Sequence, residues 1–193
     1  EIKKCVQLND KLIPIIEDGF KSLAMKKTTM PPILRLDIEK YHGESDVKAA
    51  YIEGLDSYAI KVASGFFNNP KLGLPSSNGL MILLDSKTGV LKSILLDKGY
   101  LTDLRTAIAG AIAAKHLSNP GSTKAGIIGA GIQAKLQIEA LTLVRKIDTV
   151  FIWARDSKKV NQYIKELSKL NINFKACSSP EEVVIRSEIV VTA

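Results

Sequence analysis

The spacing of apolar and polar residues in the first half of the chain predicts one helix followed by a sheet. Residues 9–27 repeat apolar side chains at helical intervals, with Asn9 as a candidate N-cap and Gly19 in the interior, before the Pro-Pro break in the segment 30–38. Short apolar runs then predict strands at residues 47–54, 58–67, 79–86 and 90–97. The turn residues between them, such as Lys87-Thr88-Gly89, favour an antiparallel or mixed sheet.

A long apolar segment separates this sheet from a second pattern. Residues 101–118 predict a helix with Ala and Ile on all sides, so we expect it to be buried rather than amphipathic. Asn119-Pro120-Gly121 ends it and predicts a hinge between two domains, residues 1–118 and 119–193. Beyond the hinge, strands and helices alternate. The predicted strands are residues 125–129, 149–155, 172–178 and 188–193, and the predicted helices are residues 132–144, 157–170 and 179–187.

This alternation indicates right-handed βαβ units around a parallel sheet. Three such strands complete one mononucleotide-binding half, and a fourth begins the second half. A fourth strand without a covering helix leaves apolar surface open, so we expect this domain to be incomplete at its C-terminus. The missing initial Met likewise indicates a clipped or partial chain. The predicted fold class is α/β, with a Rossmann-type parallel-sheet domain that follows an α+β domain.

A glycine-rich turn opens the second domain. Gly129, Gly131 and Ala134 fit the pattern G-x-G-x-x-A between a predicted strand and a predicted helix. The first glycine permits a tight turn, the second lets the backbone approach a pyrophosphate, and the small third residue lets helix and strand pack closely. The helix N-terminus adds unpaired N–H groups and a positive partial charge. The pattern predicts a dinucleotide site, and a glycine-rich turn without a ligand is the alternative.

The end of the second strand of this domain bears on the choice between NAD and NADP. An acid there would bind the ribose 2′-OH, whereas an Arg accommodates a 2′-phosphate. The strand ends without an acid at Ala154, and Arg155 and Asp156 follow. Arg155 slightly favours NADP, while Asp156 keeps NAD open. The alternative for Arg155 is a solvated loop residue.

Charge and composition narrow the class of partner. The net charge of +7 divides into 16 − 13 = +3 over residues 1–118 and 11 − 7 = +4 over residues 119–193, and aromatic residues make up 6%. Without a basic block or stacking aromatics we expect no nucleic-acid binding, and a mildly basic surface suits anionic small molecules. No apolar run is long enough for a bilayer and no signal peptide is evident, so we expect a cytoplasmic protein without membrane contact.

Cysteine and histidine give no metal-binding pattern. Cys5 and Cys177 lie far apart with no CxxC partner, which suggests neither a zinc site nor a disulfide framework. His42 and His116 lack metal-ligand spacing and are expected at the surface or at helix ends. We therefore expect no metal.

Three cations occupy unusual sequence contexts in the first domain. Arg35 follows the Pro-Pro segment, Lys61 lies among apolar residues of a predicted strand, and Arg105 lies near the start of the apolar helix. Charges in such places are costly unless they are paired. One interpretation is a substrate carboxylate held by Arg as a fork and by Lys as a point charge. The other is three separate salt bridges or snorkelling side chains.

The sequence resembles the ornithine cyclodeaminase/mu-crystallin family from about Pro31 to Ala193. The resemblance rests on the stretches MPPILRLD, YAIKVASGFFNNPKLGLPSSNGLMILLD, GYLTDLRTAIAGAIAAKHLS and GIIGAGIQA. The segments DVKAAY, GLDSYAIKVASGFF and GLPSSNGLM are most similar to cyclodeaminase-like proteins linked to ectoine utilisation. The family resemblance implies that a substrate-binding and dimerisation domain comes first and that the Rossmann domain follows the long helix. This order explains why the glycine turn comes so late in the chain.

The resemblance also implies roles for individual residues. The family's carboxylate-binding cations match Arg35, Lys61 and Arg105, with Lys61 as the catalytic candidate within this chain. The family's catalytic Asp would come after residue 193. The family's cofactor contacts match Ser76, Arg105, Ile132, Gln133 and Thr192, beside Gly129, Gly131, Ala134 and Arg155 from the motif. Ala154 replaces the acid of NAD-using ornithine cyclodeaminases, which puts NAD preference in doubt.

The reaction that the resemblance implies is hydride transfer at the α-carbon of an amino or imino acid, in a homodimer that uses NAD or NADP. A cyclodeaminase, an ammonia-lyase, oxidises the amino acid, loses ammonia on ring closure and returns the hydride to give a cyclic imino acid such as proline. A ketimine reductase instead reduces a cyclic imine such as pyrroline-2-carboxylate with NADPH. A third alternative, of another class, is a non-catalytic binder of NADP and small ligands, as mu-crystallin is known to be.

Overall fold

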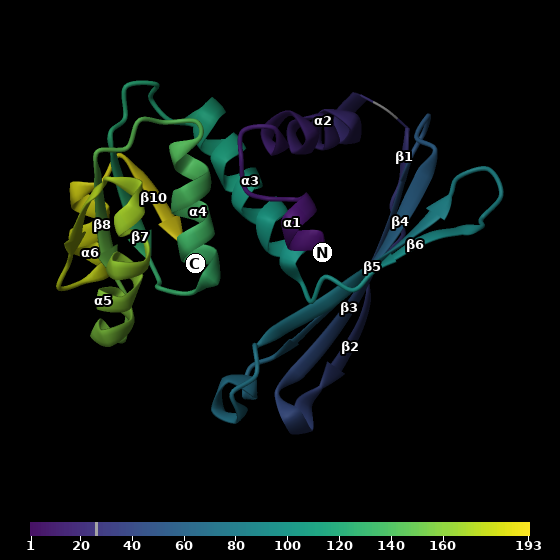
Figure 1. Ribbon diagram of the computed structural model, residues 1–193, viewed down its shortest axis with the longest axis horizontal. Helices are drawn as coiled ribbons and strands as arrows, with labels where there is room; N and C mark the ends of the chain where they lie inside the picture. Colours follow the sequence, from purple (N-terminus) through teal and green to yellow (C-terminus); the bar gives the residue numbers. More distant parts are fainter. Residues whose placement is uncertain (26) are drawn as a thin grey trace. The chain divides into compact units, whose positions relative to one another are not determined.

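The computed structural model describes residues 1–25 and 27–193, which form two compact units. The first unit comprises Glu1–Val6 and Asp18–Leu101, and the second comprises Gln7–Glu17 and Thr102–Ala193 (Figure 1). The predicted helix at residues 9–27 corresponds to α2 (Leu12–Met25), and its predicted residue Lys26 lies outside the described residues. Over the described residues, no helix is long and apolar enough to cross a membrane.

The first unit is built on one sheet of mostly antiparallel strands. Its elements are α1 (Ile2–Cys5), part of α2, β1 (Thr28–Thr29), β2 (Leu34–Ile38), η1 (Glu39–Tyr41), β3 (Gly43–Ile52), β4 (Ser57–Phe66), η2 (Asn69–Leu72), β5 (Ser77–Asp85) and β6 (Leu91–Leu95). The strand order is β1-β3-β4-β5-β6, and β2 also pairs with β3. The four predicted strands correspond to β3 to β6, and the antiparallel pairing is as predicted.

The strand β2 was not predicted, because the Pro-Pro segment next to it indicates an interruption of regular secondary structure. Residues Leu34–Ile38 pair with β3 alone, and all five are exposed. A strand at a sheet edge needs partners on one side only, so proline directly before it is tolerated. The pairing places Arg35 opposite Asp46 and therefore brings a predicted site residue onto the sheet.

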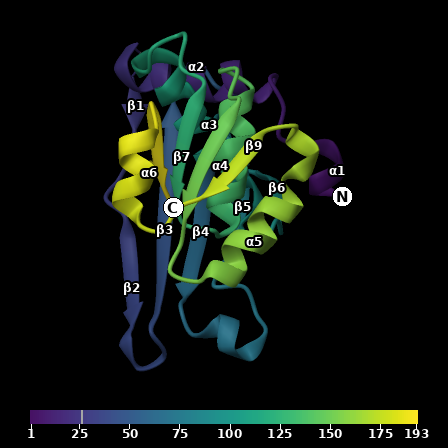
Figure 2. The ribbon, with the colours of Figure 1, turned by 90° about the vertical axis from the view of Figure 1, so that its left-hand side faces the viewer.

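The second unit contains a four-stranded parallel sheet with helices, as predicted. Its elements are the start of α2 (up to Glu17), α3 (Tyr100–Leu117, from Thr102 onward), β7 (Lys124–Ile128), α4 (Ile132–Thr142), β8 (Thr149–Trp153), α5 (Ser157–Glu166), η3 (Ser168–Leu170), β9 (Asn173–Ala176), α6 (Pro180–Arg186) and β10 (Ile189–Thr192). The strand order β10-β7-β8-β9 is that of a Rossmann half with its fourth strand added beside the first (Figure 2).

A dry core lies between this sheet and its helices. Ile127, Ile138 and Ile152 are fully buried together with the ring of Tyr163. The Tyr163 hydroxyl donates a hydrogen bond of 3.1 Å to the carbonyl oxygen of Ala134, and burial raises the pKa of Tyr163 because the phenolate would lose its hydration. This bond ties α5 to the first turn of α4.

Helix α3 packs within the second unit, so the observed units divide at Leu101/Thr102 and not at the predicted hinge. A side chain at Gly110 would collide with the Gln137 side-chain oxygen, which shows how closely α3 approaches α4. Arg145 caps the end of α3 through hydrogen bonds to the carbonyl oxygens of Ala114, Lys115 and Ser118 at 2.8–3.2 Å. These bonds are made across the predicted hinge and join its two sides.

The expectation that this helix is buried on all sides is wrong. Leu104, Ala107 and Ile108 are buried, but Leu117 is 85% exposed and Ala113 is also exposed. Alanine and isoleucine on every side of a helix do not show which side meets a neighbour. The contacts of α4 and of the first turns of α2, where Ile13 packs against Ala107 and Ile108, cover part of α3, while Ala113 and Leu117 remain exposed.

Candidate functional site

The turn after β7 has a backbone conformation that only glycine adopts without strain. Gly129 has φ of +126°, and its N–H donates to the carbonyl oxygen of Trp153 at 2.9 Å. On the other side, the N–H of Ala193 donates to Ile128 at 2.9 Å, and a side chain on Gly129 would collide with the Ala193 carbonyl oxygen. Gly129 is therefore held between the ends of β8 and β10, as the first glycine of the motif requires.

The second glycine opens the N-terminus of α4 to a ligand. Gly131 is the N-cap of α4, no side chain caps this end, and a Cβ built on Gly131 meets nothing within 4 Å. The helix therefore begins, without a side-chain cap, beside the open space at Gly131, where its positive end favours an anion. Ala134, the third small position, is fully buried against the core. All three positions have the geometry that a pyrophosphate cradle needs.

A cavity of about 440 Å³ lies at the carboxyl ends of β7, β8 and β10. Its lining comprises residues 128–131, residues 153–156, Lys159 and Ala193. The connections from β7 and β8 leave on this edge, so the cavity lies at the point where the strand order reverses. Open α/β sheets bind ligands at such a point, and the lining fits a dinucleotide.

The charged residues of this cavity are two cations and one carboxylate. Arg155 and Lys159 are exposed cations, while Asp156 begins α5. The Asp156 carboxylate accepts a hydrogen bond from the N–H of Lys158 at 2.9 Å, as an N-cap does. This cap occupies one carboxylate oxygen, and the other oxygen of Asp156 lies in the lining of the cavity beside the two cations.

Two of the predicted substrate residues lie on one face of the first unit's sheet. Arg35 pairs with Asp46, which pairs with Ala63 of β4, and Lys61 is two residues from Ala63. Because strand residues alternate between faces, Arg35 and Lys61 share a face, with β3 between their strands. The pairing brings together residues that lie 26 positions apart in the sequence.

Arg35 lies among carboxylates on this face. Its guanidinium bonds to Asp37 at 2.9 Å and to Glu44 at 2.6 Å, and Asp46 is 4.0 Å away. The hydrogen bond to Asp37, with the charges of both acids, raises the pKa of Arg35. Lys48, which is the cross-strand neighbour of Lys61, bonds to Asp46 at 3.2 Å. The face therefore carries both signs of charge in alternation.

The remaining predicted residues are placed as follows. Ser76 precedes β5 in the first unit, and its carbonyl oxygen accepts the N–H of Phe66 at 2.7 Å. Arg105 is an exposed residue of α3 in the second unit. Ile132 is 56% exposed at the start of α4, and Thr192 ends β10 beside Ile128. Roles for these residues stay predictions.

The side chain of Gln133 turns toward α3, which leaves its backbone N–H for the pyrophosphate contact that the family resemblance implies. The Gln133 Nε2 donates to Asp103 Oδ1 at 2.9 Å and to the Asp103 carbonyl oxygen at 3.3 Å. Only its backbone N–H remains for a phosphate. The sequence analysis missed Asp103 and Lys159. A basic residue in the first turn of the helix after the second strand would have indicated Lys159, whereas no local pattern indicates Asp103.

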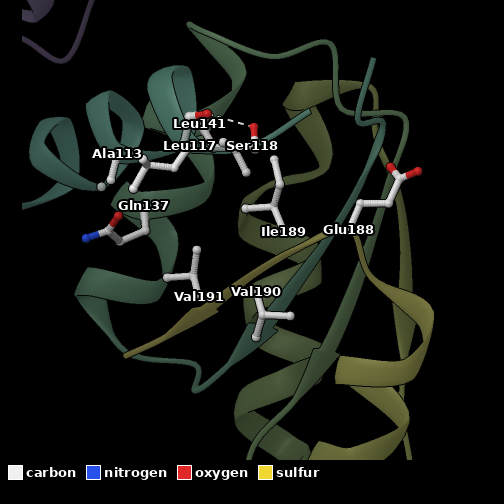
Figure 3. A pocket seen from close by; sticks show the side chains of 11 residues that line it. Ala113, Leu117, Ser118, Gln137, Leu141, Glu188, Ile189, Val190 and Val191 are labelled. Atoms are coloured by element: carbon white, nitrogen blue, oxygen red, sulfur yellow. Dashed lines mark hydrogen bonds between the residues drawn. The ribbon is translucent and has the colours of Figure 1, made fainter. Parts of the chain in front are cut away.

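A second cavity of about 410 Å³ lies between α3, α4 and β10 (Figure 3). Apolar side chains from these three elements, including Leu117, Leu141 and Val191, surround it, and Glu188 is the ionisable residue in its lining. It offers little to a charged nucleotide. Among the described residues, no group of three or more His, Cys, Asp or Glu side chains could hold a metal ion.

The strand order, the glycine turn and the cavity at the strand ends define a Rossmann-type nucleotide-binding unit joined to an antiparallel-sheet unit. The chain belongs to the ornithine cyclodeaminase/mu-crystallin family, which matches residues 1–193 and confirms the resemblance seen in the sequence.

Relatives and solved structures agree with this assignment. An uncharacterized cyclodeaminase of Sinorhizobium fredii is 51% identical over all of this chain and 59% of its own length. The Δ¹-pyrroline-2-carboxylate reductase of Thermococcus litoralis, solved with NADH and L-proline, matches 98% of this chain and 58% of its own with a TM-score of 0.92 and 31% identity. An archaeal alanine dehydrogenase dimer with bound NAD matches 100% and 57%, with a TM-score of 0.89 and 30% identity. The chain thus spans less than two thirds of the length of these relatives.

Proposed function

We propose that the protein containing this chain is an NAD(P)-dependent enzyme that transfers a hydride at the α-carbon of an amino or imino acid. The observation that carries the proposal is the turn at Gly129 and Gly131, which leaves the N-terminus of α4 open at the edge of the cavity. Relatives that share this fold bind NAD or NADH. Bound NAD(P) supplies the hydride acceptor or donor.

The residues of this chain would bind and orient the reactants. The backbone N–H groups after Gly131 hold the pyrophosphate, and Gly129 keeps the turn tight enough for it to approach. The candidates for binding the substrate carboxylate are Lys61, with Arg35 on the same sheet face of the first unit, and Arg105 on α3 of the second unit. Holding the carboxylate at fixed donors directs the α-carbon toward the hydride position, which supplies the orientation that hydride transfer needs.

Two net reactions fit this site, each with an observation in its favour. Reduction of a cyclic imine is favoured by the likeness to the Thermococcus litoralis reductase, which was solved with NADH and L-proline. Cyclisation with loss of ammonia is favoured by the 51% identity to a cyclodeaminase. A protein that only binds cofactor and a small ligand would retain the same cradle without turnover.

The deciding experiment follows nicotinamide absorbance with the full-length protein and pyrroline-2-carboxylate. Stoichiometric loss of NADPH or NADH would establish the reductase. Release of ammonia from L-ornithine with catalytic NAD⁺, and no loss in the first assay, would establish the cyclodeaminase. Tight cofactor binding with no turnover in either assay would contradict the proposal and favour a binding protein.

We propose a slight preference for NADP over NAD, which the cations of the cavity support. Arg155 and Lys159 are available to a 2′-phosphate, while the Asp156 carboxylate caps α5. Replacement of Arg155 by Ala should weaken NADPH binding about tenfold, as expected for loss of one charge-assisted hydrogen bond, and should leave NADH binding within about twofold. Fluorescence titration with both cofactors measures this, and equal losses for both would contradict the preference.

We also propose that the sheet of the first unit forms a homodimer through its other face. The register places Leu34, Val47, Val62 and Leu80 in one row across four strands, opposite in orientation to Arg35. Leu34 and its strand neighbour Leu36 are more than half exposed. A continuous apolar face of this kind favours association, and the archaeal alanine dehydrogenase is a dimer.

A further inference from the structure

The amide of Gln133 links the glycine turn to the first turns of α3. Its Nε2 donates to both the side-chain and the backbone oxygen of Asp103, at 2.9 and 3.3 Å. Its Oε1 is buried and has no hydrogen-bond partner among the described residues. The two acceptors on Asp103 therefore fix which way the amide points, because the opposite orientation would bring two oxygens together.

This contact belongs to a row of contacts between α4 and α3. One turn further along α4, the Gln137 Nε2 donates to the carbonyl oxygen of Thr106 at 3.2 Å, and the Gln137 side chain also packs where α3 has Gly110. The contact made by Gln133 lies at the end of the row next to the glycine turn. It reaches a residue 30 positions earlier in the chain.

Asp103 lies two residues before Arg105 on α3. Successive helical residues two apart point to different sides, so the Gln133 contact holds the helix while Arg105 stays exposed on another side. A cationic side chain that orients a substrate carboxylate loses much of its contribution to catalysis when it is displaced by about 1 Å. The orientation of Arg105 therefore depends on how firmly the first turns of α3 are held to the turn that would carry the cofactor.

We propose that Gln133 is a positioning residue that acts through Asp103 on Arg105. The inference rests on the proposed function, since it assigns Arg105 to the substrate carboxylate. Because the Gln133 side chain is engaged with Asp103, it contributes nothing of its own to the pyrophosphate. Substrate binding and cofactor binding should consequently separate when this amide is changed.

The test uses Gln133→Glu, Asp103→Asn and the double variant in the full-length protein. Gln133→Glu places a carboxylate against the Asp103 carboxylate, and we expect KM for the imino or amino acid to rise about tenfold, with kcat/KM falling in step, as for loss of one charge-assisted bond. The Kd for NAD(P)H should rise less than KM, and because the added carboxylate lies near the pyrophosphate site, any such rise should persist in the double variant. Asp103→Asn keeps an acceptor for Gln133 and should resemble the wild type. The double variant restores a donor–acceptor pair and should recover most of the loss.

The matched control is Gln162→Glu. Gln162 donates to Glu166 on α5 at 2.7 Å, so the same substitution again opposes two carboxylates, but away from α3. We expect no change in KM for this variant. The inference would be overturned if Gln162→Glu raised KM as much as Gln133→Glu does. It would also be overturned if Gln133→Glu raised the cofactor Kd as much as KM, or if the double variant recovered none of the loss.

A second measurement does not depend on turnover. Hydrogen exchange of the backbone N–H groups of residues 102–108 should quicken about tenfold or more in Gln133→Glu and return toward the wild-type rate in the double variant. Unchanged exchange would overturn the positioning role, whatever the activity. If the wild-type protein turns over no substrate but the variants show the expected exchange rates, the proposed function is wrong and the contact between Gln133 and Asp103 still holds α3.

Discussion

The second unit holds its candidate pyrophosphate contacts in one short segment, residues 129–134, whereas in the first unit Arg35 and Lys61 share a sheet face although β3 separates their strands. The two units also differ in how they are stabilised. Every fully buried apolar side chain of the described residues lies in the second unit. The first unit presents a sheet with charges on one face and exposed leucines on the other.

This difference shows where each unit's specificity comes from. A parallel sheet covered by helices has its core within one chain, and its turns can then hold a backbone conformation that only glycine adopts easily, as at Gly129. In the first unit the charged face carries the residues proposed for the substrate, and the opposite face carries the apolar row proposed for the dimer.

The largest effect should come from Gly129→Ala. The added methyl group meets the Ala193 carbonyl oxygen, and φ of +126° is strained for alanine, so we expect a loss of stability of about 1–3 kcal/mol or more and no measurable NAD(P)H binding. Thermal unfolding and cofactor titration measure the two effects. Gly131→Ala is the control, because its Cβ has open space. It should unfold at the wild-type temperature yet bind cofactor more weakly, and a normal affinity would contradict the cradle.

That contrast also explains what could be predicted from the sequence. The residues of the glycine turn are neighbours in the chain, and the βα alternation around them is regular, so the parallel sheet and its nucleotide edge were predicted correctly. The strand β2 was missed, because its pairing with β3 is not visible from its own five residues. Asp103 was missed for a similar reason, since its partner Gln133 comes 30 residues later.

A large effect is also expected from Lys61→Met. If Lys61 binds the substrate carboxylate, kcat/KM should fall by about one to two orders of magnitude, which corresponds to loss of a charge-assisted hydrogen bond of about 1.5–3 kcal/mol. Steady-state kinetics measure this, and cofactor Kd should not change. Lys48→Met is the matched control, because Lys48 lies directly across from Lys61 on the same face. Equal losses in both variants would indicate that the charge of the whole face matters, and not a contact of Lys61.

A smaller effect is expected on assembly from Leu36→Glu. The new carboxylate lies on the apolar face, where it would be buried without a partner in a dimer, so the dimer dissociation constant should rise at least about tenfold. Sedimentation across a range of concentrations measures it. Asp37→Asn, one residue along and on the charged face, should leave association unchanged. A monomeric wild-type protein would contradict the dimer outright.

The smallest effect should be the pH response of Glu188, which tests how the second unit holds its edge strand. The Glu188 carboxylate accepts the N–H groups of Lys124 and Thr123 at 2.9 and 2.7 Å, and these bonds lower its pKa from the usual 4.5. A lowered pKa in the folded state means that the bonds stabilise the fold above about pH 4.5 and that this stabilisation is lost as pH falls through the folded-state value.

Glu188→Gln removes the titrating carboxylate and therefore can no longer show this loss. Its unfolding temperature should therefore fall less than that of the wild type between about pH 5 and pH 3. Parallel curves for the two proteins would mean that the contact between β10 and β7 depends on the ladder of backbone hydrogen bonds and not on this carboxylate.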